Sequence, residues 1–348
     1  MKTIKKANSC KYVSDFTIDR DVIKTYSPMP GDVAIFEVLE LWSLNAIQDF
    51  EGRNCYIFEE DHIMLAFGNR YASNQFEAYV PEEYQEVYDL VGKGGVVGNV
   101  ASMYYKLEDV GPTKLKLVGY ATNSKGEVIN TIYHHKKSTP FQPFEIQPFK
   151  TILSVGASMD SGKTTTAAFL CRGLKNAGNK VAYIKLTGTI FNKDKMLCYD
   201  CGADYVSDFS EMGYPSTYLC SLDEILDIYE GLLQEVATNH PDYVVIEIAD
   251  GLYQRETHQL LNHLPFTNTL DHVILSCSDS LAVHTGIKLL SPIFSERLFA
   301  LGGLFTGSPL LVEEVEQQET LPVLTLEKLM DGHLLRTLLR DKREKMIV

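Results

Sequence analysis

The sequence predicts an α/β protein with a mostly parallel sheet in its C-terminal domain and a small β-rich N-terminal domain, either a barrel or a sandwich. Two patterns indicate this. Short apolar stretches separated by turn residues fill about 30–150, whereas apolar strands alternate with amphipathic helices from 150 onward. The length of 348 residues is sufficient for two domains. We expect a β-rich domain over 1–137, a proline-containing linker over 138–149, and the second domain over 150–348.

Composition excludes several classes of protein. Lys plus Arg total 32 and Asp plus Glu total 46, for a net charge of −14. A large duplex-DNA footprint needs a basic face, so we expect no nucleic-acid partner. No apolar run reaches about 18 residues, which predicts no membrane span. The N-terminal lysines precede no apolar stretch, and seven cysteines fit reduced thiols, so we expect a cytoplasmic protein.

In the N-terminal half, strands are expected where apolar runs lie between turn residues. Pro30-Gly31 opens the first run and Asn123–Gly126 forms a hairpin turn before the last. The stretch 81–92 has the spacing of one short helix. The expected strands cover 31–41, 55–58, 62–67, 115–121 and 127–135.

In the C-terminal half, short apolar strands alternate with stretches whose apolar residues have helical spacing. A strand at 150–157 leads through a Gly-rich turn into a helix at 164–178, and an amphipathic helix at 222–240 carries apolar residues at helical spacing. Such alternation predicts a parallel sheet with right-handed crossovers. The further expected strands cover 180–186, 242–250, 271–277, 299–305 and 321–326.

The stretch GASMDSGKTTT, Gly156–Thr166, follows a strand and opens a helix, the context that a phosphate loop requires. Backbone N–H groups and the helix N-terminus can cradle a polyphosphate there. Lys163 would bridge the β and γ phosphates, and Thr164 would place its hydroxyl on Mg²⁺. The residues expected to bind the nucleotide are Ser158, Met159, Asp160, Ser161, Gly162, Lys163, Thr164 and Thr165.

Charged residues follow the neighbouring strands. Lys185 ends one strand at the edge where open α/β sheets bind ligands, and it could neutralise charge on a transferring phosphoryl group. Glu247 ends another and is a candidate Mg²⁺ ligand beside Thr164. Asp160, inside the loop, is a third candidate metal ligand. Substrate contacts are expected from Lys185, Thr187 and Asp250.

The loop has five residues between Gly156 and Gly162, and this spacing resembles that of dethiobiotin synthetase and of the ATP-binding domain of cobyric and cobyrinic acid amide ligases. Val181–Thr189 is similar to the second strand of that family, with Lys185 at its lysine and Leu186 departing from its proline. The IEIADG segment resembles its E-G-A-G-G segment, although Ile248 and Asp250 replace glycines. The resemblance covers about 150–330 and identifies a P-loop NTPase domain.

The resemblance implies an enzyme that uses Mg²⁺ and ATP to phosphorylate a small carboxylate or carbamate and then forms a C–N bond. Lys163, Lys185 and Glu247 would be its catalytic residues. A small-molecule kinase would use the same parts, and a nucleotide-switched binding protein would hydrolyse ATP slowly. The partner is expected to be a small molecule, with a homodimer possible for this class.

Three other motifs stay open. Cys198 and Cys201 form a lone CxxC, which cannot complete a tetrahedral zinc site and is interpreted as two unrelated thiols. The polar segment 201–218 is a candidate lid or substrate wall, with Asp204, Asp208 and Ser216 as candidate residues. The stretch 67–81 is either a binding loop or an ordinary hairpin connection.

Overall fold

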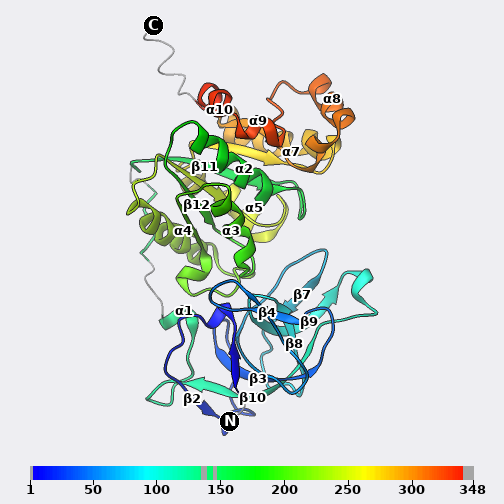
Figure 1. The fold of residues 1–348 in the computed structure, drawn as a ribbon, viewed down its shortest axis with the longest axis vertical. Helices are drawn as coiled ribbons and strands as arrows, with labels where there is room; N and C mark the ends of the chain where they lie inside the picture. The colour runs from blue at the N-terminus through cyan, green and yellow to red at the C-terminus, as the bar shows by residue number, and fades with distance from the viewer. Residues whose placement is uncertain (1–2, 135–138, 144–146, 340–348) are drawn as a thin grey trace. The chain divides into compact units, whose positions relative to one another are not determined.

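The computed structural model describes residues 3–134, 139–143 and 147–339 (Figure 1), so part of the predicted linker at 138–149 lies outside the described residues. The chain divides into two compact units. The first, which we call the barrel unit, contains Met1–Ser138, Thr187–Lys193 and Phe209–Cys220. The second, which we call the sheet unit, contains Thr139–Leu186, Asp194–Asp208 and Ser221–Val348.

Five strands of the barrel unit form a closed ring. β6 pairs with β3 on one side and with β9 on the other, and β10 and β8 complete the ring in the order β6-β3-β10-β8-β9. Of the two predicted architectures, this closure is that of a barrel. The strands are β1 (Ile4–Lys6), β2 (Thr17–Asp19), β3 (Val33–Glu40), β4 (Ala46–Gln48), β5 (Asn54–Tyr56), β6 (His62–Phe67), β7 (Phe76–Tyr79), β8 (Tyr88–Gly92), β9 (Val96–Met103) and β10 (Lys114–Thr122), and the one α-helix of the unit's described part is α1 (Thr131–His134).

Aromatic side chains fill the ring. Phe36, Phe67, Tyr88 and Tyr120 are fully buried, and their rings pack against one another, mostly edge to face. The helix predicted over 81–92 is wrong. Its last five residues form β8, which is buried throughout and pairs with β9 and with β10. Closure of the ring therefore overrides the local helical spacing.

The sheet unit contains a six-stranded sheet in the order β13-β12-β14-β11-β15-β16, with every neighbouring pair parallel. This confirms the predicted fold class. The strands are β11 (Lys150–Gly156), β12 (Val181–Lys185), β13 (Tyr205–Asp208), β14 (Tyr243–Glu247), β15 (His272–Ser276) and β16 (Leu298–Gly302). The expected strand at 321–326 is reduced to one bridge between Leu301 and Val323.

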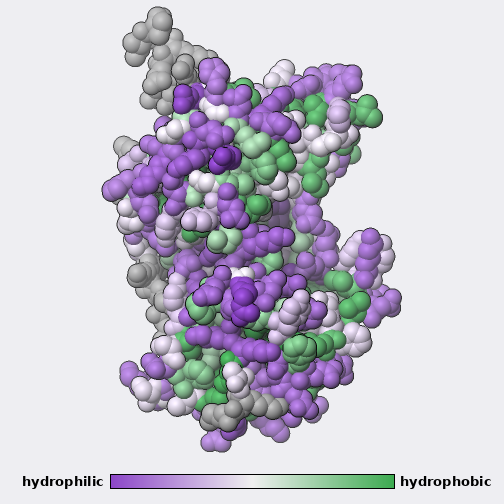
Figure 2. Space-filling view, viewed as in Figure 1, coloured by the Kyte–Doolittle hydropathy of each residue, from purple (hydrophilic) through white to green (hydrophobic). Residues whose placement is uncertain are grey.

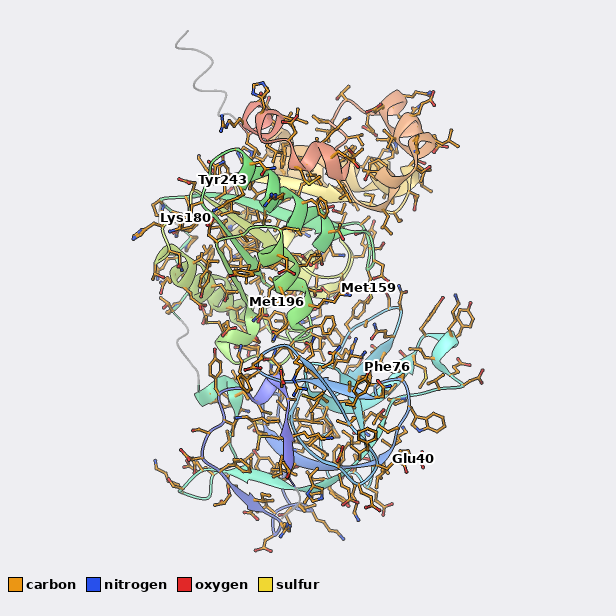
Figure 3. The ribbon with its side chains drawn as sticks, viewed as in Figure 1. Glu40, Phe76, Met159, Lys180, Met196 and Tyr243 are labelled. Carbon is orange, nitrogen blue, oxygen red and sulfur yellow. The ribbon has the colours of Figure 1, made fainter. Side chains whose placement is uncertain are left out.

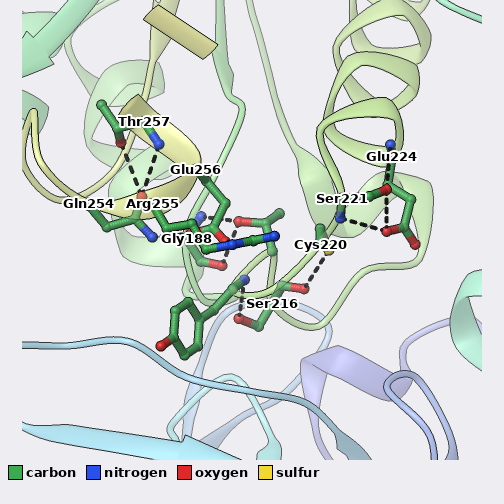
Figure 4. Close-up of polar contacts among 11 residues, drawn as sticks. Gly188, Ser216, Cys220, Ser221, Glu224, Gln254, Arg255, Glu256 and Thr257 are labelled. Atoms are coloured by element: carbon green, nitrogen blue, oxygen red, sulfur yellow. Dashed lines mark hydrogen bonds and ion pairs between the residues drawn. The ribbon is translucent and has the colours of Figure 1, made fainter. Parts of the chain in front are cut away.

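Helices connect and cover these strands (Figure 1). Apolar residues of α2 share one core with α9, α10 and the sheet, and α4 begins with a capping box between Ser221 and Glu224 (Figure 4). The helices are α2 (Lys163–Asn176), α3 (Asn192–Asp200), α4 (Leu222–Ala237), α5 (Arg255–Leu261), α6 (Leu264–Thr267), α7 (Ser280–Phe294), α8 (Pro309–Gln318), α9 (Leu326–Met330) and α10 (Gly332–Leu338).

Two segments of the second half belong to the barrel unit, which the sequence analysis did not anticipate. In 187–193, the Asn192 side chain accepts a hydrogen bond from Asn8 at 2.9 Å, and its backbone N–H donates to Gln48 at 3.0 Å. In 209–220, Glu211 accepts from Lys11 at 2.7 Å. The chain therefore passes between the units more than once, and one of these points falls inside α3, after Lys193.

No helix among the described residues is both long and apolar enough to cross a membrane. On the face drawn in Figure 2, hydrophilic residues predominate, and hydrophobic ones occur in small groups between them.

Candidate functional site

The predicted phosphate loop lies between β11 and α2. β11 ends at Gly156, and α2 begins at Lys163 with Gly162 as its N-cap residue. Gly162 has φ 93°, a left-handed conformation that glycine adopts without a steric penalty. In Figure 3, Met159 marks this loop, and Lys180 and Tyr243, which lie at the starts of β12 and β14, mark the opposite end of the sheet. The loop therefore lies at the carboxyl end of the strands, where ligands of such sheets bind.

Glycines allow the neighbouring strand ends to approach the loop closely. A Cβ added to Gly251 would lie 2.6 Å from the carbonyl oxygen of Ala157, and one added to Gly303 would clash with the carbonyl oxygen of Ser161. The backbone N–H of Leu304 donates to the Ser161 carbonyl at 3.1 Å. The loop backbone is thus held from two sides, after β14 and after β16.

Lys163 is buried, with only 7% of its surface exposed. Its Nζ donates to the carbonyl oxygen of Ser158 at 2.8 Å, within the same loop. Burial lowers the pKa of Lys163, although the charges of Glu247 and Asp250 act in the opposite direction. A desolvated ammonium group inside a loop at a helix N-terminus is well placed to gain from an anionic ligand.

Glu247, the last residue of β14, is held by two hydroxyl groups. Its Oε1 accepts from Thr164 Oγ1 at 2.9 Å, and its Oε2 accepts from Tyr183 OH at 2.9 Å. Burial raises the pKa of Tyr183, and the charge of Glu247 raises it further. The phenol therefore stays protonated and donates, which fixes the orientation of the carboxylate next to Thr164.

Lys185, the last residue of β12, pairs with Asp194 on α3, and its Nζ lies 3.6 Å from Glu247 Oε1. Strand register places Lys185 beside Glu247 on one side and beside Asp208 on the other. Burial alone would lower the pKa of Lys185, but Asp194 and Glu247 together raise it. Lys185 therefore stays protonated and cannot act as a base near neutral pH.

The residues around Thr164 fit a magnesium ion. A hydroxyl and a carboxylate 2.9 Å apart are oxygen ligands of the kind that Mg²⁺ prefers. Among residues 3–134, 139–143 and 147–339, no group of three or more His, Cys, Asp or Glu side chains could hold a metal ion. Thr164 and Glu247 would therefore share the ion with phosphate oxygens and water.

The other predicted site residues are placed as follows. Ser158, Asp160 and Thr165 are exposed, and Asp160 and Asp250 have the positive φ values 58° and 61°. The negative charges of Asp160 and Asp250 raise the pKa of Lys163, against the larger effect of burial. Thr187 begins a segment of the barrel unit, where it is buried. Their proposed roles stay predictions.

Of the candidate lid residues, Asp204 does not belong to the site. It pairs with Lys175 and accepts from the backbone N–H of Val181 at 2.9 Å, at the start of β12 and so at the opposite end of the sheet. Asp208 ends β13 and pairs with Lys195 at 3.0 Å, and Ser216 belongs to the barrel unit.

The pKa values of the Cys198 and Cys201 thiols are raised, in both cases mainly by burial.

The sequence analysis missed Tyr183 and Asp194. Tyr183 precedes Lys185 by two residues on one strand, and side chains two residues apart on a strand lie on the same face of the sheet. This alternation could have identified Tyr183. Asp194 follows a loop at the start of α3, and no spacing rule links it to Lys185.

A parallel sheet whose first strand leads through a GKT-containing loop into a helix, with lysine and threonine at the helix start, defines the fold of the P-loop NTPases. No protein-family model and no curated protein matches the sequence.

Several solved structures are similar to part of the chain. They include the signal recognition particle receptor FtsY from Elizabethkingia anophelis, with 17% identity, 60% of this chain and 70% of that chain covered, and a TM-score of 0.35. A ParA family ATPase from Chlorobium tepidum is 15% identical, the match covers 57% of this chain and 97% of that chain, and the TM-score is 0.32. The GTPase PAB0955 from Pyrococcus abyssi is 15% identical, the match covers 56% of this chain and 97% of that chain, and the TM-score is 0.31. Because these scores are low, the fold class rests on the loop and the sheet of this chain.

Proposed function

We propose that the sheet unit binds ATP with Mg²⁺ through the loop 156–165, and that the protein transfers the γ-phosphate to a small carboxylate or carbamate in a ligase-type reaction. One observation carries the nucleotide part of this proposal. A buried lysine at the N-terminus of α2 lies next to a threonine whose hydroxyl donates to the carboxylate of Glu247 at 2.9 Å. This combination offers a cation, N–H donors and a metal-binding pair within one loop and one strand end.

Each residue has a defined task in this proposal. Backbone N–H groups at the start of α2 bind phosphate oxygens, with help from the helix dipole. The Lys163 ammonium exchanges the Ser158 carbonyl, 2.8 Å away, for phosphate oxygens. Thr164 and Glu247 would hold Mg²⁺, which supplies charge neutralisation on the phosphates when bound. Tyr183 keeps the Glu247 carboxylate oriented toward Thr164.

Lys185 would stabilise charge on the transferring phosphoryl group. It stays protonated, and it lies at the same strand-end edge as Glu247, in register with it. Catalysis would therefore depend on positioning and charge stabilisation by this lysine rather than on proton abstraction by it. The carboxylate or carbamate acceptor is inferred from the resemblance of 156–164, 181–189 and 246–251 to dethiobiotin synthetase and the amide ligases.

A nucleotide-switched binding protein is the second candidate, and the division of the chain favours it. The segments 187–193 and 209–220, which follow β12 and β13, belong to the barrel unit rather than to the sheet unit. Both follow strand ends at the edge where the nucleotide would bind. A change at this edge on nucleotide binding could therefore be passed along the chain into the barrel unit.

The test is ADP release by the full chain, measured with Mg²⁺-ATP and a panel of small carboxylic acids and amines, with Lys163→Ala as the control. Ligase chemistry predicts turnover that depends on a carboxylate or carbamate and is lost in the variant. Turnover that depends on a hydroxyl compound would identify a kinase instead. Slow turnover that no acceptor changes would favour the switch. Sedimentation with and without nucleotide tests whether the chain forms the homodimer expected from its resemblance to this class.

A further inference from the structure

The ammonium group of Lys185 lies between two carboxylates at the end of β12. Nζ pairs directly with Asp194 and lies 3.6 Å from Glu247 Oε1. The lysine side chain is 12% exposed, Glu247 is 1% exposed, and Asp194 is 25% exposed. Two carboxylates thus share one largely buried cation.

The other groups around Glu247 do not neutralise it. Thr164 and Tyr183 donate neutral hydroxyl hydrogen bonds to its two oxygens. Lys163, the other nearby lysine, donates to the carbonyl oxygen of Ser158 instead. Within the described part of the chain, Lys185 is the one cationic side chain within ion-pair distance of Glu247.

We propose that Lys185 is a built-in counter-cation, which occupies the Glu247–Asp194 pair in the metal-free protein and which a magnesium ion must displace to reach Glu247. Two carboxylates and one ammonium sum to a charge of minus one, so a divalent ion added beside the ammonium meets repulsion as well as attraction. In the presence of nucleotide, the displaced ammonium is free to turn to the phosphates. Only that last step rests on the proposed function.

The chemistry of the two cations supports this exchange. A lysine ammonium is a compact point charge on a flexible stem, so it can leave a carboxylate by rotation of its side chain. Removing it leaves the buried Glu247 carboxylate and the partly exposed Asp194 without their shared cation, and an uncompensated buried charge is strongly destabilising. A metal ion that then binds the same oxygens restores the lost stability, because a ligand that binds only the folded state raises its stability.

The test is thermal unfolding of Lys185→Met in increasing Mg²⁺ without any nucleotide. The variant should unfold several degrees below the wild-type protein, and millimolar Mg²⁺ should recover most of that loss. The wild-type midpoint should change little over the same titration. The apparent dissociation constant for Mg²⁺ should be at least about tenfold lower in the variant.

Lys195→Met is the matched control. Lys195 is also a buried lysine of the sheet unit, and its Nζ lies 3.0 Å from Asp208, which ends β13 on the other side of β12 from Glu247. It should lose stability in the same way, but Mg²⁺ should not restore it. Adding Glu247→Gln to Lys185→Met should abolish the recovery.

An equal response to Mg²⁺ in Lys185→Met, Lys195→Met and the wild-type protein would overturn the proposal. If Lys185→Met does not fold, Lys185→Gln keeps a polar end and allows the same titration. Because no nucleotide is present, a failure here leaves nucleotide binding untouched. Conversely, if the protein proves not to bind nucleotide, the Mg²⁺ response of Lys185→Met still tests the role of Lys185 as a counter-cation.

Discussion

Gly251→Ala tests whether the loop must keep its position for nucleotide binding. The new Cβ would lie 2.6 Å from the Ala157 carbonyl oxygen and 2.8 Å from Ser158 Cα. Ordinary van der Waals contacts begin at 3.4 Å. Both contacted atoms belong to the backbone and cannot rotate away, so the loop and the segment after β14 must separate. Gly251 does not have a positive φ, so the effect is purely steric.

The size of the effect follows from the overlap. Introducing one methyl group into a filled site costs about 1–3 kcal/mol. Part of this cost appears as lost stability of the free protein, and the rest appears when the ligand requires the original loop position. If all of it falls on binding, nucleotide affinity drops by about 5- to 150-fold.

Two measurements separate these contributions: urea unfolding of the free protein and fluorescence titration with a labelled nucleotide. Gly307→Ala is the control, because nothing lies within 4 Å of its added Cβ and its φ is not positive. This variant should match the wild-type protein in both measurements. A Gly251→Ala protein that is as stable as wild type and binds nucleotide as tightly would show that the loop does not need the close approach of Gly251.

Three further substitutions have defined outcomes. Glu247→Gln keeps the shape of the side chain beside Thr164 but removes its negative charge. Added Mg²⁺ should then no longer strengthen nucleotide binding, and an unchanged response to Mg²⁺ would contradict a metal site at Thr164 and Glu247. Tyr183→Phe removes the 2.9 Å hydrogen bond to Glu247 and should cost about 1 kcal/mol in urea unfolding; no loss would show that the phenol does not hold the carboxylate. Asp279 caps α7 through the backbone N–H of Ala282 at 2.8 Å, and this hydrogen bond lowers its pKa. Asp279→Ala should therefore lower the free energy of unfolding by about 0.5–1 kcal/mol above pH ~3.9. The difference between variant and wild type should vanish as pH falls through the lowered pKa of Asp279 in the folded state. A difference that does not change with pH would argue against a cap by the charged carboxylate.

The sequence predicted five of the six strands of the sheet, all but β13, because their signals are local. The strand before Gly156, the helix after Lys163 and the apolar strands that end at Lys185 and Glu247 are each encoded within a few residues. In a parallel sheet these strand ends meet at one edge, so three residues far apart in the chain could be assigned to one site without knowing the strand order.

The contacts that orient these residues could not be predicted in the same way. Asp194 on α3 pairs with Lys185 at the end of β12, and no spacing in the sequence links these two residues. The error at β8 has a related cause. Tyr88–Gly92 forms a buried strand that pairs with β9 and with β10, and nothing in the local spacing of 81–92 indicates these distant partners.

Calorimetric titration of ATP and GTP with Mg²⁺ into the wild-type protein and Lys163→Ala shows whether the loop 156–165 holds a nucleotide. We expect ATP to bind to the wild-type protein and not to the variant, since Lys163 is the buried cation of the loop. Stronger binding of GTP would keep the site and correct the nucleotide. If the well-folded wild-type protein binds neither nucleotide, the loop 156–165 is not a nucleotide site.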